Sequence, residues 1–404
     1  MPVIVACPTD GSPGSGLGPA PIVGRVEPIL SLDLTTLHRR TSMKWRRYPE
    51  DVLPLWVAEM DTPLAPAVRE ELLRVVTEGD TGYPEGNAYA EAFAVFAAEE
   101  WGWTFDPARQ AVLSPDVMQG IAMLLAQAVR PGERVVINSP VYAPFWAVVR
   151  NAGAELVDVP LTEEGRLDLD AHEAAYAQGV AVHLLSSPHN PTGVVHTREE
   201  LTRLAELARR HDVLLLADEI HSPLVGPGER FVPLLDVPGG EHAISLVSAS
   251  KAWNLAGLKG ALIIAGPEQL EQLRALSYES TRGAASHVAL RAHTAALTGA
   301  RDWLVQLRTE LQANRELLDR LLADHLPAVR HRLSRGTYLA WLDCRELGLA
   351  NPARHFLDEA RVALNDGAAF GPRTAGFARI NLATSPAIIT EAVTRMGRSV
   401  SGPR

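Results

Sequence analysis

Short apolar runs alternate with helical patterns through the middle of this 404-residue chain. Runs that fit strands lie at Ala111–Leu113, Arg134–Asn138, Glu155–Val159, Val180–Leu185, Val213–Ala217, Ala243–Val247 and Ala261–Ala265. Helical spacing of apolar residues fills most of the gaps, at Asp116–Val129, Pro144–Asn151, Leu169–Ala177 and Arg198–His211. This alternation predicts an α/β fold with a mostly parallel seven-stranded sheet sandwiched by helices. Several runs are apolar throughout, as in strands buried on both faces.

The sequence on either side of this region predicts further elements of mixed type. Before it, helices are expected at Pro66–Glu78 and Tyr89–Trp101. After it come a helical region at Gln269–Leu326, broken near Arg282-Gly283, strands at His331–Leu342 and Phe377–Ala383, and helices at Asn351–Ala360 and Ile388–Met396. We therefore predict a disordered tail at residues 1–40, a segment at 41–65 that packs with a small domain, a large cofactor-binding domain at 66–290, and a small α+β domain at 291–404.

Composition limits the class of protein. The formal charge of −10 argues against a nucleic-acid partner. Cys7 and Cys344 are the only cysteines, so neither a disulfide framework nor a cysteine-rich metal site is expected. The longest apolar runs are too short to cross a bilayer. We expect a cytoplasmic protein without a membrane partner, and a signal peptide at Met1–Cys7 is the lesser alternative.

Four polar residues follow predicted strands at their carboxyl ends, where an open α/β sheet forms its ligand crevice. Lys251 follows Ala243–Val247, and Asp218 directly follows Val213–Ala217. Asn190 and Tyr142 come after two further strands. Taken singly, they fit a solvated lysine, a helix cap, a plain turn and a packing aromatic residue. Together at one face of one sheet, they favour a functional site.

The lysine and the aspartate suggest a specific chemistry. Burial disfavours the ammonium form of a lysine, so its amine becomes a usable nucleophile. A carboxylate at a buried strand end needs a partner, because an isolated buried charge is costly. Lys251 joined to pyridoxal 5'-phosphate (PLP) as a Schiff base, with Asp218 beside the protonated pyridine nitrogen, would satisfy both conditions.

A phosphate group also needs a binding site. Ser114-Pro115-Asp116 predicts a helix start with the proline at the first helical position. The free amides of Val117 and Met118 could then hold an anion at the positive end of the helix dipole. Ser248 could add a hydroxyl group, and Lys259 a positive charge. A plain helix start explains Ser114 and Asp116 equally well and does not exclude a phosphate.

The motifs resemble those of fold-type I PLP-dependent enzymes in the class I/II aminotransferase superfamily. Asn190-Pro191-Thr192-Gly193, Asp218-Glu219-Ile220-His221 and Ser248-Ala249-Ser250-Lys251 stand in that family's order and spacing. The sequence is more narrowly similar to the MalY/PatB-like cystathionine β-lyases, a group of carbon–sulfur (C–S) lyases. That likeness rests on Leu53–Asp61, Asp218–His221, Gly336–Trp341, Asn365–Gly371 and Phe377–Ala383.

The resemblance implies a role for each candidate residue. Lys251 would carry PLP, Asp218 would pair with the pyridine nitrogen, Asn190 would bind the phenolic oxygen, and Tyr142 would stack on the ring. The phosphate would be held by Val117, Met118, Ser248 and Lys259, and by Tyr83 from the neighbouring subunit of a homodimer. Arg379 would bind the substrate carboxylate, with Trp56 and Ala58 also at the substrate. If the resemblance to the family is set aside, an ion pair within the small domain is the simpler explanation of Arg379.

Two positions depart from the aminotransferase pattern. His221 stands where those enzymes usually have a tyrosine near the phenolic oxygen, which favours the lyase branch. Lys259 stands where many have arginine.

We therefore predict β-elimination on L-cystathionine or another S-substituted L-cysteine, giving a thiol, pyruvate and ammonia. The alternatives are a class I/II aminotransferase and a PLP-binding regulatory protein with little turnover.

Overall fold

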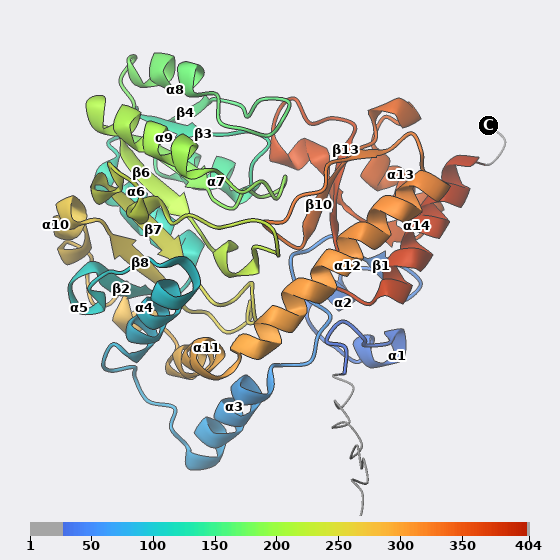
Figure 1. Cartoon of the computed structure of the whole chain (residues 1–404), viewed down its shortest axis with the longest axis horizontal. Helices are drawn as coiled ribbons and strands as arrows, with labels where there is room; N and C mark the ends of the chain where they lie inside the picture. The colour runs from blue at the N-terminus through green and yellow to red at the C-terminus, as the bar shows by residue number, and fades with distance from the viewer. Residues whose placement is uncertain (1–26, 402–404) are drawn as a thin grey trace, which may run out of the picture.

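The computed structural model describes residues 27–401 and contains a large mixed sheet of seven strands (Figure 1). The strands are β2 (Ala111–Ser114), β3 (Arg134–Ile137), β4 (Glu155–Asp158), β5 (Val182–Ser186), β6 (Leu214–Asp218), β7 (Ala243–Val247) and β8 (Ala261–Ala265). They lie in the order β2-β8-β7-β6-β5-β3-β4. The neighbours from β7 to β4 are parallel, while β8 runs antiparallel to both β7 and β2. The predicted fold is confirmed.

Helices cover both faces of this sheet. Alternate strand residues point to opposite faces, so Leu184 packs in one apolar cluster and Leu185 in another. The first cluster includes α6 (Val117–Ala128) and α7 (Pro144–Asn151), and the second includes α8 (Leu169–Tyr176) and α9 (Arg198–Arg210). Strands buried on both sides need apolar residues throughout, which explains the uninterrupted runs in the sequence.

A second, antiparallel sheet has the order β12-β13-β10-β9. Its strands are β9 (Arg330–His331), β10 (Leu339–Asp343), β12 (Asn365–Asp366) and β13 (Phe377–Asn381). It packs with α13 (Pro352–Glu359), α14 (Pro386–Ser401) and the 25-residue α12 (Arg301–His325), which crosses between the two parts of the molecule in Figure 1. The expected strand at His331–Leu342 was wrong in its middle, where residues 332–338 form no strand.

The amino-terminal residues corrected one prediction. Residues 1–26 of the expected tail lie outside the described part of the chain, but residues 27–40 are not a loose tail. The amides of Ile29 and Leu30 donate to the Glu310 carboxylate on α12 over 2.9 and 2.7 Å, and both side chains are buried. A helix, α1 (Leu34–Leu37), follows, with Leu37 in the apolar core of the second sheet. The local sequence does not indicate this order, because the partner that provides it, Glu310 on α12, is distant in sequence.

The 41–65 segment lies beside the second sheet. It contains α2 (Met43–Arg46) and the short strand β1 (Leu53–Pro54), which pairs in parallel with β11 (Val362–Ala363). Buried Lys44 donates to the Asp61 carboxylate over 2.7 Å. The exact domain boundaries stay a prediction.

The remaining α-helices are α3 (Pro66–Glu78), α4 (Ala88–Trp101), α5 (Pro107–Gln110), α10 (Leu270–Arg274) and α11 (His287–Gly299). The break expected near Arg282 falls between α10 and α11. Across residues 27–401, none of the helices has the length and apolar character needed to cross a membrane.

His196, in the loop before α9, makes stability sensitive to acid. It is buried, its two ring nitrogens lack hydrogen-bond partners among the described residues, and burial lowers its pKa to about 3. The folded state therefore resists protonation that the unfolded chain accepts near pH 6.5. Stability from the neutral ring is present above that pH and is lost as pH falls toward 3.

We expect His196→Leu to become more stable relative to the wild type as pH falls. Below about pH 6.5, the difference in unfolding free energy should change by about 1.4 kcal/mol per pH unit. Urea unfolding between pH 7.5 and pH 5 measures it. The matched control is His325→Leu, at an exposed position. A difference that does not vary with pH would contradict the prediction.

Candidate active site

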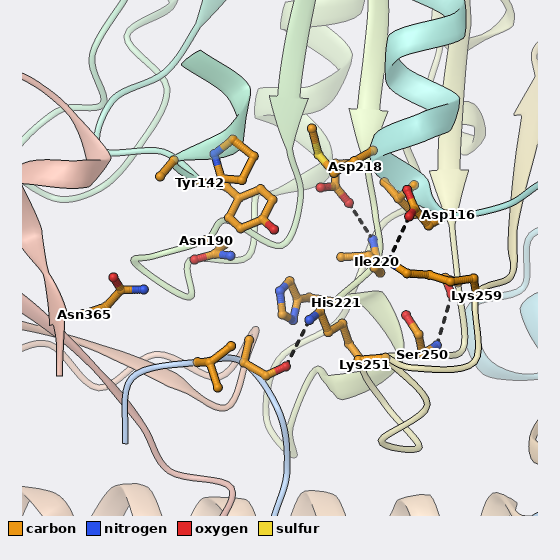
Figure 2. A pocket seen from close by; sticks show the side chains of 18 of the residues that line it. Asp116, Tyr142, Asn190, Asp218, Ile220, His221, Ser250, Lys251, Lys259 and Asn365 are labelled. Carbon is orange, nitrogen blue, oxygen red and sulfur yellow. Dashed lines mark hydrogen bonds and ion pairs between the residues drawn. The ribbon is translucent and has the colours of Figure 1, made fainter. Parts of the chain in front are cut away.

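A cavity of about 420 Å³ lies at the carboxyl ends of the parallel strands, between the two sheets. Its lining includes Tyr142, Asn190, Asp218 and Lys251, which point toward a common space in Figure 2. They come from separate connections of the large sheet, and Lys251 and Tyr142 are more than 100 positions apart in the sequence. The parallel topology alone brings such ends together. The structure thus gathers the four strand-end residues at one site.

Lys251 lies in a turn after β7, with its half-buried side chain lining this cavity. Its Nζ donates to the Ala58 carbonyl over 3.0 Å. Burial, and then the positive charge of Arg379, lower the pKa of the amine to about 8 against the opposing charges of Glu59 and Asp218. About a tenth of the amine is therefore neutral at pH 7, and this is the form that a nucleophile or a general base requires.

Asp218 is the last residue of β6, and its carboxylate is buried at the cavity wall. The amide of Ile220 donates to Oδ1 over 3.1 Å. No basic nitrogen of residues 27–401 lies within 4.0 Å of the carboxylate. Burial raises its pKa to about 6, against the opposing effects of the Ile220 amide and of Lys251. A carboxylate in this position would gain stability from a cationic ligand.

Arg379, on β13, brings a buried positive charge to the opposite side of the cavity. Its guanidinium donates to Asn190 Oδ1 over 2.9 Å and to the Trp56 carbonyl over 3.0 Å, and it lies over the Phe370 ring. No carboxylate of the described residues lies within 4.0 Å, and Nε is buried without a partner there. Burial lowers its pKa to about 10. The alternative that Arg379 serves an internal ion pair is therefore wrong.

The start of α6 forms another wall. Helix α6 begins at Val117, with Asp116 as the N-cap. Pro115 therefore precedes the helix, and the prediction that it occupies the first helical position is wrong. Val117 and Met118 line the cavity, and the amides of the first helical residues have no acceptor within the helix. Lys259 Nζ lies 2.9 Å from Asp116 Oδ2, which places a cation at this end. The wall can therefore receive an anion.

Ser248 lines the same wall, but its hydroxyl group is already engaged. Its Oγ donates to the Gly260 carbonyl over 2.6 Å and accepts from the Ser250 amide over 3.1 Å. A contact with a phosphate oxygen would need this hydroxyl hydrogen to rotate away from Gly260. In this arrangement Ser248 supports the turn that carries Lys251.

His221 also faces the cavity. Its ring is buried, its Nδ1 has no partner among the described residues, and it meets the Tyr338 ring edge-on at a centroid distance of 5.9 Å. Burial, and then the charge of Lys251, hold the pKa of His221 well below its usual value. The imidazole is therefore neutral. Tyr142 is the nearby aromatic wall, and burial raises its pKa as well.

Three other candidates have different positions. Ala58 lines the cavity and accepts the Lys251 hydrogen bond. The Trp56 side chain does not belong to the lining, which corrects its expected role, since Trp56 reaches Arg379 through its backbone carbonyl. Tyr83 is 86% exposed and lies outside the cavity of its own chain. Within one chain it therefore contributes nothing to the site.

Sequence reasoning missed several lining residues. Ser250, Ile220, Asn365, Phe370 and Val57 belong to the cavity wall although no role was predicted for them. Each lies within a motif that carries the family resemblance. Their positions in those motifs were the available signal, but motif membership does not say which side chains face a cavity.

The residues present fit PLP. The cavity has the volume of a cofactor site, and its walls offer a lysine, an unpaired buried carboxylate, an aromatic ring and an anion-binding helix start. The buried carboxylate, Asp218, suits a protonated pyridine nitrogen, and Arg379 remains for a second anion.

Comparison with known proteins agrees with this geometry. The family described as "Aminotransferase class I and II" matches residues 50–396. A Mycobacterium tuberculosis protein provisionally named a cystathionine beta-lyase is 48% identical over 92% of this chain and 98% of its own length. The Corynebacterium glutamicum cystathionine beta-lyase is 32% identical over 90% and 98%.

A solved structure is also similar. A PLP-dependent beta-cystathionase of Corynebacterium diphtheriae, likewise provisionally named, is 34% identical, with a TM-score of 0.88 over 93% of this chain and 99% of that one.

Proposed function

Since this chain belongs to the family of class I and II aminotransferases, we propose that it is a PLP-dependent C–S lyase acting on L-cystathionine or another S-substituted L-cysteine. The reaction is β-elimination: the thioether and one water give a thiol, pyruvate and ammonia. The observation that carries this proposal is the buried Arg379, which has no carboxylate partner in the described part of the chain and faces the same cavity as Lys251 and Asp218. That arrangement suits an amino acid held by its carboxylate. Similarity to cystathionine beta-lyases favours elimination over amino transfer.

Each residue has a defined task in this proposal. Lys251 would hold the cofactor covalently, and after release its neutral amine would take the proton from the substrate Cα. Asp218 would keep a proton on the pyridine nitrogen, and Arg379 would orient the substrate by a bidentate pair with its carboxylate. PLP, when bound, supplies the electron sink that makes the Cα proton acidic.

The remaining contacts would position the cofactor. The α6 amides of Val117 and Met118, with Lys259, would bind the phosphate. Asn190 would bind the phenolic oxygen, with the neutral His221 close by, and Tyr142 would lie against the ring.

An assay with L-cystathionine tests the proposal. Purified protein with added PLP should release pyruvate and a thiol without any keto acid. Dependence on a keto-acid acceptor would identify an aminotransferase instead. Inertness under both conditions, despite bound PLP, would favour a regulatory protein.

We also propose that the protein is a homodimer. Apolar side chains on α3 and the loop after it face outward, with Leu73 60%, Val76 69% and Tyr83 86% exposed. Exposed apolar groups of this kind are typical of a surface that another chain covers. In this dimer Tyr83 would reach the phosphate in the partner's cavity. A cytoplasmic location stays a prediction from the sequence.

Mixed dimers test the role of Tyr83. A phosphate hydrogen bond is charge-assisted, so we expect Tyr83→Ala to lose at least about tenfold in activity. Co-expression with Lys251→Ala should restore about a quarter of wild-type activity, because half of the dimers then contain one complete site. Co-expression of Lys251→Ala with Asp218→Asn is the matched control and should restore nothing, because both defects remain in their own chains. The absence of recovery in the first pair would contradict Tyr83 acting across the interface.

A further inference from the structure

The segment Trp56–Asp61 borders the cavity and is held to the second sheet by hydrogen bonds to its backbone. Arg379 donates to the Trp56 carbonyl over 3.0 Å. Asn381 Nδ2 donates to the carbonyls of Val57 and Glu59 over 2.7 and 2.6 Å. These contacts fix the segment relative to the side of the site that would bind the substrate carboxylate.

Asn254 links the same segment to the turn that carries Lys251. Its Oδ1 accepts from the Met60 amide over 2.9 Å, and its Nδ2 donates to the Met60 carbonyl over 2.8 Å. One side chain therefore binds both polar groups of one backbone residue, as a neighbouring strand would. Asn254 has φ of 57°, a left-handed conformation that asparagine tolerates better than most residues.

The lysine turn does not need this side chain to hold its shape. The buried Trp253 donates from Nε1 to the Ala300 carbonyl over 3.0 Å, and the Leu255 amide donates to the Ser250 carbonyl over 2.8 Å. The first contact ties the turn to the residue before α12, and the second closes the turn on itself. The Asn254 side chain is therefore directed to a partner outside the turn.

That partner carries the acceptor for Lys251. Met60 lies two residues after Ala58, whose carbonyl accepts from Lys251 Nζ over 3.0 Å and from the Tyr338 hydroxyl over 2.9 Å. If Lys251 were joined to the cofactor, its nitrogen would turn toward that group and its contact with Ala58 would be given up. Within residues 27–401, the hydrogen bonds of Asn254 are then the ones that still tie the turn to this segment.

We propose that Asn254 is a positioning residue that holds the Ala58 carbonyl in place as the resting acceptor for the amine of Lys251. The inference rests on the proposed function. If a substrate amine displaced Lys251, the freed amine would donate to the Ala58 carbonyl, as it does in this structure, and this hydrogen bond would orient the lone pair of the amine and favour the displaced state. Loss of Asn254 lets the lysine turn shift relative to the segment, so displacement becomes less favourable and the amine is misplaced for proton transfer.

The test separates displacement of Lys251 from binding of a carboxylate. L-Alanine has an amine but no β leaving group, whereas propionate has only the carboxylate. We expect Asn254→Ala to weaken L-alanine binding about tenfold, read from the absorbance change of the bound cofactor, since both hydrogen bonds of the Asn254 side chain to Met60 are lost and the acceptor for Lys251 is no longer held in place. Propionate binding, read from its competition with L-alanine, should stay within about twofold because Arg379 is unchanged. In the same variant, kcat should fall at least about tenfold.

Two further variants address the backbone. Asn254→Gly keeps the left-handed conformation without the side chain, and it should show the same defects as Asn254→Ala. Asp212→Ala is the matched control: this residue also has a positive φ of 56°, its side chain is 99% exposed, and it lies outside the cavity. It should bind both ligands as the wild type does.

Two results would overturn the inference. Equal weakening of L-alanine and propionate would indicate a general loosening of the site, and wild-type behaviour of Asn254→Gly would indicate backbone strain. Failure of the proposed function looks different, because the wild type itself would then show no absorbance change with L-alanine or no pyruvate from L-cystathionine.

Discussion

Replacing Lys251 with alanine will abolish the visible absorbance of lysine-linked PLP and lower pyruvate release from L-cystathionine at least about 1000-fold. The loss is large because one amine performs two tasks, covalent attachment and proton removal. Burial lowers the pKa of this amine to about 8, which makes it reactive near neutral pH. Absorbance spectra and a coupled pyruvate assay on the purified variant measure both effects.

The chain offers a sharp control because Lys44 and Lys259 are its only other lysines. Lys44 is paired with Asp61 in the interior, and Lys259 lies at the α6 end of the cavity. Lys259→Ala should keep the visible absorbance and bind PLP more weakly, through its lost charge. Borohydride reduction of the wild type, followed by peptide mass analysis, should place the adduct on Lys251. An adduct on either other lysine, or turnover by Lys251→Ala at the wild-type rate, would refute the assignment.

Replacing Asp218 with asparagine will lower kcat at least about 100-fold while the protein still folds and binds PLP. The amide has the size of the carboxyl group and still accepts a hydrogen bond from Ile220. What it lacks is the negative charge that would keep the pyridine nitrogen protonated. Single-turnover kinetics with L-cystathionine, together with urea unfolding, separate the chemical defect from any loss of stability.

Glu219, the residue after Asp218, provides the matched control variant. Glu219 is buried as well, and burial raises its pKa to about 8, so the side chain is mostly protonated at neutral pH. It accepts a hydrogen bond from the Leu234 amide over 2.8 Å. Glu219→Gln therefore changes little and should keep wild-type kcat within about twofold. If both variants lost activity equally, the charge of Asp218 would not be the cause.

Local patterns in the sequence were sufficient to predict the large sheet. The predicted run Ala243–Val247 coincides with β7, and the helix predicted at Pro144–Asn151 coincides with α7. Such runs depend on periodicity within a few residues, which burial on one or both faces imposes. The parallel order of the strands then predicts that Lys251 and Asp218 lie at one edge of the sheet.

Contacts between distant segments could not be predicted in this way. Glu310 orders the residues around Ile29 from across the chain, and nothing near Ile29 in the sequence indicates it. Trp56 was predicted to lie at the substrate, whereas it is outside the cavity lining and its carbonyl makes the contact with Arg379. A carbonyl has the same chemistry at every residue, so sequence cannot show which one faces a site.

The sequence by itself determined the sheet and the strand-end residues, because these follow from local periodicity and from a topology rule. The side-chain chemistry of Lys251 and Asp218, with motifs that resemble those of PLP-dependent enzymes, indicated the cofactor. Only the tertiary structure decided that Arg379 is buried without an acidic partner among residues 27–401, and that Asn254 holds the backbone beside the Ala58 carbonyl. Burial and hydrogen-bond partners depend on which segments meet in space, and the partners of Asn254 lie 194 residues away.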